Sequence, residues 1–270
     1  MRDIKLIAMD LDGTLLQPDN TILPETLAAL KEINRRGIIT AIASGRFPEN
    51  ASLTFIDYGL TGPVIGSNGA MIEDAPMGNT IFLHSMRSRS AYMVAEILEQ
   101  FHADYILYTL KRVTTCRTDL RHHSEIKDGQ RIHEMSGLTY AHGYPAIKET
   151  IRQGVCKFFV MNHPELPAIA DAINVIPGIH VTRSGLNNLE IMPEGVHKGR
   201  GITELARFLN IPLSQVMAFG DEYNDLTMLS CVGMGIAMGN APVEVREKCA
   251  FTTVPSDQNG IARAIEKYIL

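Results

Sequence analysis

The stretch Met9-Asp10-Leu11-Asp12-Gly13-Thr14-Leu15 decides the fold expected for this chain. It continues a short apolar run that begins at Leu6, and it places two carboxylates directly before a glycine. An apolar run of this length that ends at a glycine predicts a buried strand leading into a turn. Two neighbouring acids repel each other, and a hard cation with oxygen ligands, such as Mg²⁺ completed by a phosphate, relieves that repulsion. On its own, the Asp-x-Asp spacing favours a surface turn whose side chains cap the local backbone.

The same arrangement, an apolar run followed by polar residues, occurs twice more. The run 38–43 precedes Ser-Gly-Arg at 44–46, and the run 216–219 precedes Gly-Asp-Glu-Tyr-Asn-Asp at 220–225. Continuous apolar runs are typical of parallel strands covered on both faces. The carboxyl ends of such strands meet at one edge of an open α/β sheet. We therefore expect the polar residues that follow the three runs to lie together: Asp10, Asp12, Ser44, Asp221 and Asp225.

Four short motifs resemble, in order, those of the haloacid dehalogenase (HAD) superfamily. They are Asp-Leu-Asp-Gly-Thr-Leu at 10–15, Ser-Gly-Arg at 44–46, Lys-Gly at 198–199, and Gly-Asp-Glu-Tyr-Asn-Asp at 220–225. The stretches Ser-Asn-Gly-Ala at 67–70 and Leu-Glu-Ile-Met-Pro at 189–193 are similar to the Cof-type (subclass IIB) sugar phosphatases. This resemblance implies an α/β fold, with a doubly wound, mostly parallel Rossmann-like core and an inserted α/β cap domain.

Helical and strand patterns alternate along the chain, in agreement with that fold class. Pro24 opens a helical stripe, and the strand expected at 38–43 follows it, which gives a strand–helix–strand unit and a parallel pair. Between the motif-bearing ends, residues 84–145 hold six of the nine histidines. We expect a catalytic core formed by 1–83 and 190–270 and a cap domain at 84–189 that determines substrate specificity.

Composition excludes several classes of protein. The 270 residues, 45% of them apolar, can form one large or two moderate domains, and a net charge of −5 argues against binding to nucleic acid. No apolar run approaches the length of a membrane span, and the run 6–9 is too short for a signal peptide. The four cysteines lack metal-site or disulfide-framework spacing. We expect a cytoplasmic protein, a monomer or homodimer, with no nucleic-acid or membrane partner.

The two acids of the first motif are expected to have different chemical roles. Asp10 would attack phosphorus and form an aspartyl-phosphate. Asp12 would protonate the leaving group and later deprotonate the attacking water. The Asp10 carboxylate, the Asp12 backbone carbonyl and the Asp221 carboxylate would bind Mg²⁺, and Asp225 would orient water or a lysine beside the metal.

The remaining motif residues would bind the phosphate. The Ser44 hydroxyl and neighbouring backbone N–H groups, including that of Gly45, would hold one phosphate oxygen, and Lys198 would neutralise the nucleophile and the transferring group. Asn224 would contact metal-bound water or the substrate. Each has a structural alternative, since Ser44 could cap the following helix and Lys198 could be solvated. Arg46 is interpreted as a surface or cap-contact residue.

Four further residues have mainly structural interpretations. Asn68 could supply a left-handed turn before Gly69 or position the backbone near the site. Glu190 could form a structural pair or contact the substrate, and the structural pair is favoured. The neighbouring His122 and His123 would point apart in either a helix or a strand, which disfavours a shared metal. They are interpreted as cap-surface residues that could face the substrate.

These residues predict a Mg²⁺-dependent phosphatase acting on small phosphorylated metabolites, with sugar phosphates as the class that the resemblance implies. A sugar phosphomutase would use the same aspartyl-phosphate, and the motifs do not separate the two. A non-catalytic protein that binds phosphorylated metabolites is the other alternative, which the intact acids and lysine disfavour. A dehalogenase is disfavoured because its chemistry does not need the acid at Asp12.

Overall fold

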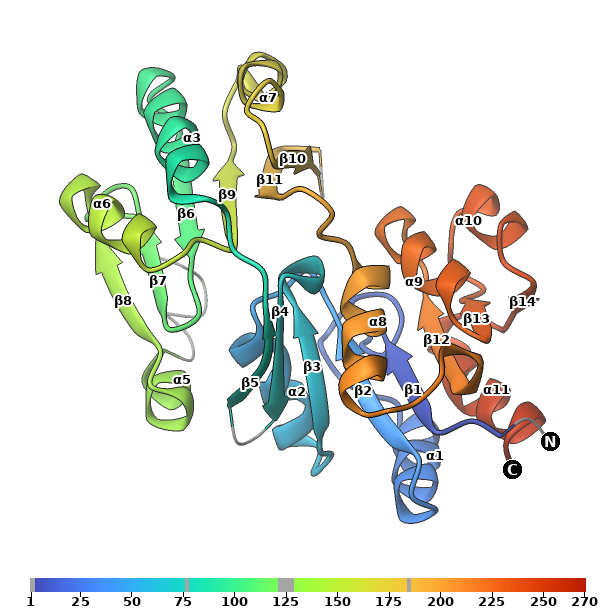
Figure 1. Cartoon of the computed structure of the whole chain (residues 1–270). Helices are drawn as coiled ribbons and strands as arrows, with labels where there is room; N and C mark the ends of the chain where they lie inside the picture. The colour runs from blue at the N-terminus through green and yellow to red at the C-terminus, as the bar shows by residue number, and fades with distance from the viewer. Residues whose placement is uncertain (1–2, 76–77, 121–128, 184–185) are drawn as a thin grey trace. The chain divides into compact units, whose positions relative to one another are not determined.

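The computed structural model describes residues 3–75, 78–120, 129–183 and 186–270. The chain divides into two compact units, which are distinguished by colour along the chain in Figure 1. The first unit comprises Met1–Phe82 and His197–Leu270, and the second comprises Leu83–Val196. The second unit is therefore an insertion within the first.

The first unit is built on an eight-stranded sheet with the order β14-β13-β12-β1-β2-β3-β4-β5. Neighbouring strands from β14 to β3 run parallel, whereas β3 and β4 are antiparallel. The strands are β1 (Leu6–Met9), β2 (Ile39–Ala43), β3 (Gly62–Gly66), β4 (Met71–Ala75), β5 (Asn79–Leu83), β12 (Val216–Gly220), β13 (Met234–Ala237) and β14 (Phe251–Thr252). All four residues of β1 are buried, because helices cover both faces of the sheet at this central strand.

Two hydrophobic clusters attach helices to the two faces of this sheet. One cluster joins α1, α2 and α11 through residues such as Leu30, Phe55 and Ile265, and the other joins α8 and α9 through Leu205 and Met228. The helices are α1 (Pro24–Arg35), α2 (Pro48–Asp57), α8 (Lys198–Phe208), α9 (Leu226–Cys231), α10 (Val243–Glu247) and α11 (Gly260–Tyr268). Short 3₁₀ turns are η1 (Ser67–Gly69), η2 (Leu213–Gln215), η3 (Tyr223–Asp225) and η4 (Ser256–Gln258). This is the doubly wound architecture that the sequence predicts.

The second unit contains a six-stranded sheet with the order β10-β11-β9-β6-β7-β8. Its pairs are antiparallel except β7 with β8. The strands are β6 (Asp104–Tyr108), β7 (Arg112–Thr115), β8 (Thr139–His142), β9 (Lys157–Met161), β10 (Ile179–Thr182) and β11 (Asn188–Pro193). The helices are α3 (Ser88–Gln100), α5 (Gly129–Ser136), α6 (Tyr144–Arg152) and α7 (Leu166–Asn174). A separate core packs α3, α6 and α7 against this sheet, which makes the second unit an α/β domain with its own hydrophobic interior.

The second unit begins within one residue of the predicted cap boundary and ends seven residues beyond it, at Val196 rather than Leu189. The predicted limit lies inside β11, whose residues pair with β9 and β10. A strand that is hydrogen-bonded on both sides cannot be divided between two units. The ladder therefore places all of Asn188–Pro193 with the second unit.

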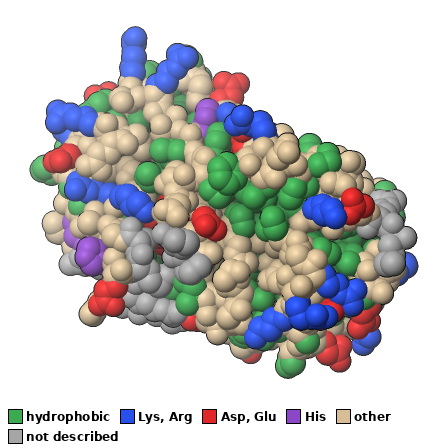
Figure 2. All heavy atoms as spheres, turned by 60° about the horizontal axis from the view of Figure 1, so that its bottom comes forward, with side chains coloured by type: hydrophobic (Ala, Val, Ile, Leu, Met, Phe, Trp, Pro, Cys, Tyr) green, Lys and Arg blue, Asp and Glu red, His purple; other side chains and the backbone are tan. Residues whose placement is uncertain are grey.

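Charged side chains of both signs are mixed on the surface. On the face shown in Figure 2, Lys and Arg side chains stand beside Asp and Glu side chains, in keeping with the modest net charge of −5. Within the described ranges, no helix combines the length and the apolar character needed to cross a membrane.

Candidate active site

The carboxyl ends of three adjacent parallel strands bring the predicted site residues together. Met9, the last residue of β1, is in register with Ile42 of β2 and Phe219 of β12. The ladder continues one residue further, because the N–H of Asp10 donates to the carbonyl of Phe219 at 3.0 Å. Asp10 therefore leaves the sheet beside Asp221, as expected for polar residues that follow parallel strands.

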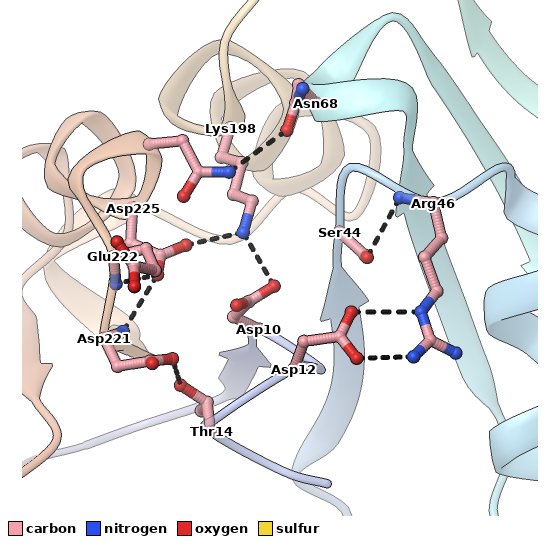
Figure 3. Close-up of polar contacts among 11 residues, drawn as sticks. Asp10, Asp12, Thr14, Ser44, Arg46, Asn68, Lys198, Asp221, Glu222 and Asp225 are labelled. Carbon is pink, nitrogen blue, oxygen red and sulfur yellow. Dashed lines mark hydrogen bonds and ion pairs between the residues drawn. The ribbon is translucent and has the colours of Figure 1, made fainter. Parts of the chain in front are cut away.

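Lys198 forms the centre of the polar cluster that Figure 3 shows. Its Nζ lies 2.7 Å from Oδ1 of Asp10 and 2.6 Å from Oδ1 of Asp225. The lysine side chain is only 1% exposed, which excludes the solvated alternative. Burial alone would lower the pKa of Lys198, but the neighbouring carboxylates of Asp10 and Asp225 outweigh that effect and raise it. The lysine is therefore a fixed positive charge beside the Asp10 carboxylate.

Asp221 is held by donors from two other segments. The Thr14 hydroxyl donates to its Oδ1 at 2.6 Å, and Nδ2 of Asn240 lies 3.2 Å from its Oδ2. Gly13 has a φ of +81°, and a Cβ at that position would overlap Oδ2 of Asp221. The glycine of the first motif thus serves two purposes, since it permits the turn and leaves room for the acid of the fourth motif.

Both carboxylate oxygens of Asp225 accept hydrogen bonds from donors of the protein. Its Oδ2 accepts from the backbone N–H groups of Asp221 and Glu222, each at 2.9 Å, while its Oδ1 accepts from Lys198. A Cβ at Gly220 would overlap the Asp225 side chain, so this position also needs a glycine. These contacts fit a residue that orients the Asp221 loop and the lysine.

Asp12 points away from this cluster, toward Arg46 (Figure 3). Nε of Arg46 donates to Oδ2 of Asp12 at 3.0 Å, and a terminal guanidinium nitrogen donates to Oδ1. The same terminal nitrogen lies 3.2 Å from Oδ1 of Asn20. The Asp12 side chain is 60% exposed, so it can reach molecules in the solvent. The interpretation of Arg46 as a surface residue missed this pairing, because no local pattern links two residues on different loops.

The Ser44–Arg46 loop is braced by η1. The N–H of Ser67 donates to the Arg46 carbonyl at 2.8 Å, and the N–H of Asn68 donates to the Ser44 carbonyl at 3.0 Å. Both η1 residues have left-handed backbones, with φ of 48° and 54°, an uncommon conformation for residues with side chains. The left-handed conformation predicted for Asn68 is confirmed. Its Oδ1 also accepts from Nδ2 of Asn224 at 3.4 Å, which connects the stretch at 67–70 with the fourth motif.

The cluster has the charge and donor set of a cation site. One oxygen from each of Asp10, Asp221 and Asp225 lies within 4.8 Å of the others, and the cluster includes only one ammonium group, that of Lys198. Burial, followed by repulsion from Asp225, raises the pKa of Asp10 to about 7. Burial is also the main cause of the rise in the pKa of Asp221 to about 6. Carboxylates that are costly to ionise together are stabilised by a hard divalent cation, so these residues fit Mg²⁺.

Sequence reasoning missed two residues that hold Asp221. Thr14 belongs to the first motif, which by itself predicts no contact with Asp221, and Asn240 lies outside the four motifs. A signal for Asn240 does exist, because Met234–Ala237 is a further apolar run that is soon followed by glycine and a polar residue. The resulting strand β13 lies next to β12, so its carboxyl end reaches the same edge of the sheet.

In the second unit, Glu190 pairs with Lys157, whose Nζ lies 2.6 Å from Oε1 of the glutamate. The pairing predicted for Glu190 is confirmed. His122 and His123 lie outside the described residues.

Comparison with known proteins identifies the family. Residues 7–265 match the family model of haloacid dehalogenase-like hydrolases. An HMP-PP phosphatase from Serratia proteamaculans is 31% identical over 248 residues, which cover 88% of this chain and 84% of that protein. The solved structure of a haloacid dehalogenase-like hydrolase from Bacteroides thetaiotaomicron gives a TM-score of 0.82 at 25% identity, covering 98% and 99% of the two chains.

A HAD subclass IIB sugar phosphatase shares the fold, with a TM-score of 0.78 at 23% identity over 98% of each chain. The predicted Cof-type resemblance and fold class are both confirmed. The chain belongs to the haloacid dehalogenase-like hydrolases, as a phosphatase of phosphoric monoesters.

Proposed function

We propose that this enzyme is a Mg²⁺-dependent phosphatase that hydrolyses sugar phosphates and related small metabolites through an aspartyl-phosphate on Asp10. One observation carries the proposal: a buried aspartate, paired with a buried lysine, adjoins a second aspartate that protein donors hold in place. The family supports phosphatase activity on small phosphorylated metabolites in general. The metal, the intermediate and the sugar class are the finer parts of the proposal.

Asp10 is suited to act as the nucleophile. Lys198 binds Oδ1 of the carboxylate, and within the described part of the chain no hydrogen bond to Oδ2 is seen. Attack by this oxygen forms an O–P bond as the bond between phosphorus and the leaving oxygen breaks. The lysine stays close to the phosphoryl group throughout, and its charge stabilises the negative charge on the transferring oxygens.

Asp12 is suited to move the protons of both half-reactions. It gives a proton to the leaving oxygen in the first step. In the second step it takes a proton from the water that attacks phosphorus, and the Asp10–phosphorus bond breaks to release phosphate. Arg46 fixes the direction of the Asp12 side chain, which has to reach an oxygen outside the buried cluster.

Three groups of this chain would hold the metal: the Asp10 carboxylate, the Asp12 carbonyl and the Asp221 carboxylate. When bound, Mg²⁺ supplies positive charge against the phosphate and the clustered acids. The Ser44 hydroxyl and the backbone of Gly45 would bind a phosphate oxygen, with Asn224 at the same edge of the sheet. The hydroxyl of Ser44 accepts from the N–H of Arg46 at 3.1 Å, so its own proton is available to donate.

The second unit is proposed to determine substrate specificity. The residues of the first unit assigned above recognise phosphate and metal, which are common to all substrates of this chemistry. Discrimination between leaving groups therefore needs another part of the protein, and Leu83–Val196 is the insertion large enough to supply it. Exchanging this unit for that of a relative with different substrates should change substrate preference and leave the Mg²⁺ requirement intact. A chimaera that folds and keeps the parent's preference would place specificity in the first unit.

The experiment that tests the function is phosphate release from a panel of sugar phosphates and other phosphorylated metabolites, with Mg²⁺ or excess EDTA. Asp10→Asn should abolish turnover with the fold unchanged by circular dichroism, and EDTA should abolish turnover by the parent enzyme. Substantial activity in either case would contradict the mechanism. Product analysis separates the alternatives, because a mutase returns an isomeric sugar phosphate in place of free phosphate. A binding protein would release neither product.

A further inference from the structure

Asn240, in the loop between β13 and α10, joins three segments of the first unit. Its Nδ2 lies 2.9 Å from the carbonyl of Gly13 and 3.2 Å from Oδ2 of Asp221. Its Oδ1 accepts from the backbone N–H of Ser256, at 3.0 Å, at the start of η4. One side chain therefore links the turn after β1, the loop after β12 and the segment before α11.

The chemistry of these partners fixes the orientation of the Asn240 amide. A backbone N–H can only donate, so the group facing Ser256 must be the amide oxygen. A backbone carbonyl can only accept, so the group facing Gly13 must be the amide nitrogen. The second N–H of the same nitrogen is then directed to Asp221. The donation to Asp221 thus follows from two independent contacts.

The Asp221 carboxylate consequently receives one donor on each oxygen, Thr14 on Oδ1 and Asn240 on Oδ2. Each carboxylate oxygen can accept two hydrogen bonds or ligands, so both oxygens keep capacity for a cation. Two donors from different segments restrict rotation of the carboxylate, and Gly13 has no side chain that would displace it. Fixing an oxygen ligand before the cation arrives lowers the entropy lost on binding.

We propose that Asn240 is a positioning residue that, through Asp221, sets the affinity of the enzyme for Mg²⁺. This inference rests on the proposed function, since it assumes that Asp221 is a metal ligand. Asn240 acts through Asp221 and is not itself a ligand of the metal or of the substrate. Partners that orient a metal ligand typically change metal affinity by about 10-fold to 100-fold when they are removed.

The test is calorimetric titration of Mg²⁺ alone into metal-stripped enzyme, with no substrate present. Asn240→Ala should weaken the dissociation constant for Mg²⁺ by about 10-fold to 100-fold. In turnover assays, the same variant should need correspondingly more Mg²⁺ and should recover most of its kcat at saturating Mg²⁺. A residue that only supports the fold would lower the melting temperature without this selective shift in metal dependence.

Thr26→Val is a matched control. The substitution removes the 3.2 Å hydrogen bond from the Thr26 hydroxyl to Oδ1 of Asn259, which lies in the same C-terminal segment as Ser256. This hydrogen bond does not involve Asp221. The Mg²⁺ affinity of Thr26→Val should equal that of the parent. Because Asn240 is exposed, its substitution should leave the metal-free melting temperature close to that of the control. Asn240→Ser provides a second variant that keeps a polar side chain but is too short to bridge these partners.

The outcomes separate the inference from the proposed function. A parent enzyme that binds Mg²⁺ and releases phosphate, together with Asn240 variants of unchanged Mg²⁺ affinity, would overturn the inference alone. A parent enzyme that binds no Mg²⁺ would overturn both. Weaker binding in the Asn240 variants and unchanged binding in Thr26→Val would support the inference.

Discussion

Arg46 and Asp12 form a two-point ion pair between the loop after β2 and the loop after β1. Nε of the arginine lies 3.0 Å from Oδ2 of the aspartate, and a terminal nitrogen contacts the other carboxylate oxygen. The two side chains are 35% and 60% exposed. Exposed pairs typically contribute about 0–1 kcal/mol to stability. The effect of this pair should therefore be seen in the direction of Asp12 more than in the stability of the fold.

We predict that Arg46→Met lowers kcat by about 10-fold to 100-fold, because a catalytic group displaced by about 1 Å can lose this much rate. The melting temperature should remain close to that of the parent. Arg35→Met is the control, since Arg35 forms a similar exposed two-point pair with Glu32 on α1, away from the site. Steady-state kinetics and thermal melting measure both effects. An Arg46→Met enzyme with the kcat of the control would show that the pair does not direct Asp12.

Asp12→Asn separates proton transfer from metal binding. The substitution keeps the backbone carbonyl proposed to bind the metal but removes the carboxylate proposed to move the proton. We expect kcat to fall by about 10²-fold to 10⁴-fold, the usual contribution of a general acid–base residue. The dissociation constant for Mg²⁺ should change much less, as calorimetry can measure. Near-normal kcat across pH would mean that another group transfers the proton.

Gly13→Ala should damage the site through sterics. Gly13 and Gly37 share a φ of +81°, but a Cβ at Gly13 overlaps Asp221, whereas a Cβ at Gly37 meets no atom within 4 Å. Both alanine variants should lose about 1–2 kcal/mol of stability from the left-handed backbone. Only Gly13→Ala should also lose Mg²⁺ affinity and kcat. Equal activity in the two variants would show that the loop carrying Asp221 moves to accommodate the added methyl group without loss of kcat.

The buried acids predict a pH-dependent stability of the metal-free enzyme. Folding raises the pKa of Asp10 from 3.8 to about 7 and that of Asp221 from 3.8 to about 6. The folded state therefore binds more protons than the unfolded chain between about pH 4 and 7, and stability must fall as pH rises through this range. Thermal melting in EDTA from pH 5 to 8 should show a falling melting temperature.

Two comparisons check the cause of this pH dependence. Asp221→Asn should reduce its slope, because one of the two ionising groups is gone. Saturating Mg²⁺ should counteract the decrease at the upper end of the range, since it binds the ionised carboxylates. A melting temperature that rises over this range in EDTA would contradict the raised pKa values.

The buried pair of Lys157 and Glu190 should be important for the stability of the second unit. Their side chains are 7% and 5% exposed, and Nζ of Lys157 also lies 5.4 Å from the ring centre of Phe159. Lys157→Met would leave a buried carboxylate without its ammonium partner, which typically costs about 3–5 kcal/mol.

Differential scanning calorimetry should resolve this loss, and the double variant Lys157→Met/Glu190→Met should recover part of it because no buried charge remains. Lys5→Met is the control, because its pair with Asp3 is exposed. A Lys157→Met loss as small as that of the control would show that the buried carboxylate gains another partner or a proton at little cost.

Much of the core fold could be predicted because its signals are local. The run Leu6–Met9 forms β1 as predicted, and the helical stripe that opens at Pro24 forms α1. Each signal lies within one element, where apolar spacing and terminal glycine or proline determine the conformation. The carboxyl-edge rule for parallel strands then placed Asp10 beside Asp221 with no need for atomic detail.

The limits of the second unit were harder to predict, because they depend on pairing between strands. Leu189 and Glu190 are neighbours within β11, and nothing local distinguishes a strand of one sheet from a strand of the other. Their membership follows from the ladders to β9 and β10. Those partners are known only when the chain is folded.

The sequence by itself determined the strands of the core, the order of the motifs, and the meeting of Asp10, Asp221, Asp225 and Lys198 at the edge of the sheet, whereas the turn of the Asp12 side chain away from that cluster was not expected. Tertiary structure alone decided how those groups are held: Arg46 on Asp12, and Thr14 and Asn240 on Asp221. The physical reason is the separation along the chain between the residues that determine each feature. Burial and backbone preference produce a periodic pattern of apolar residues within each helix or strand. A hydrogen bond between side chains on separate loops depends on where the folded sheet places those loops.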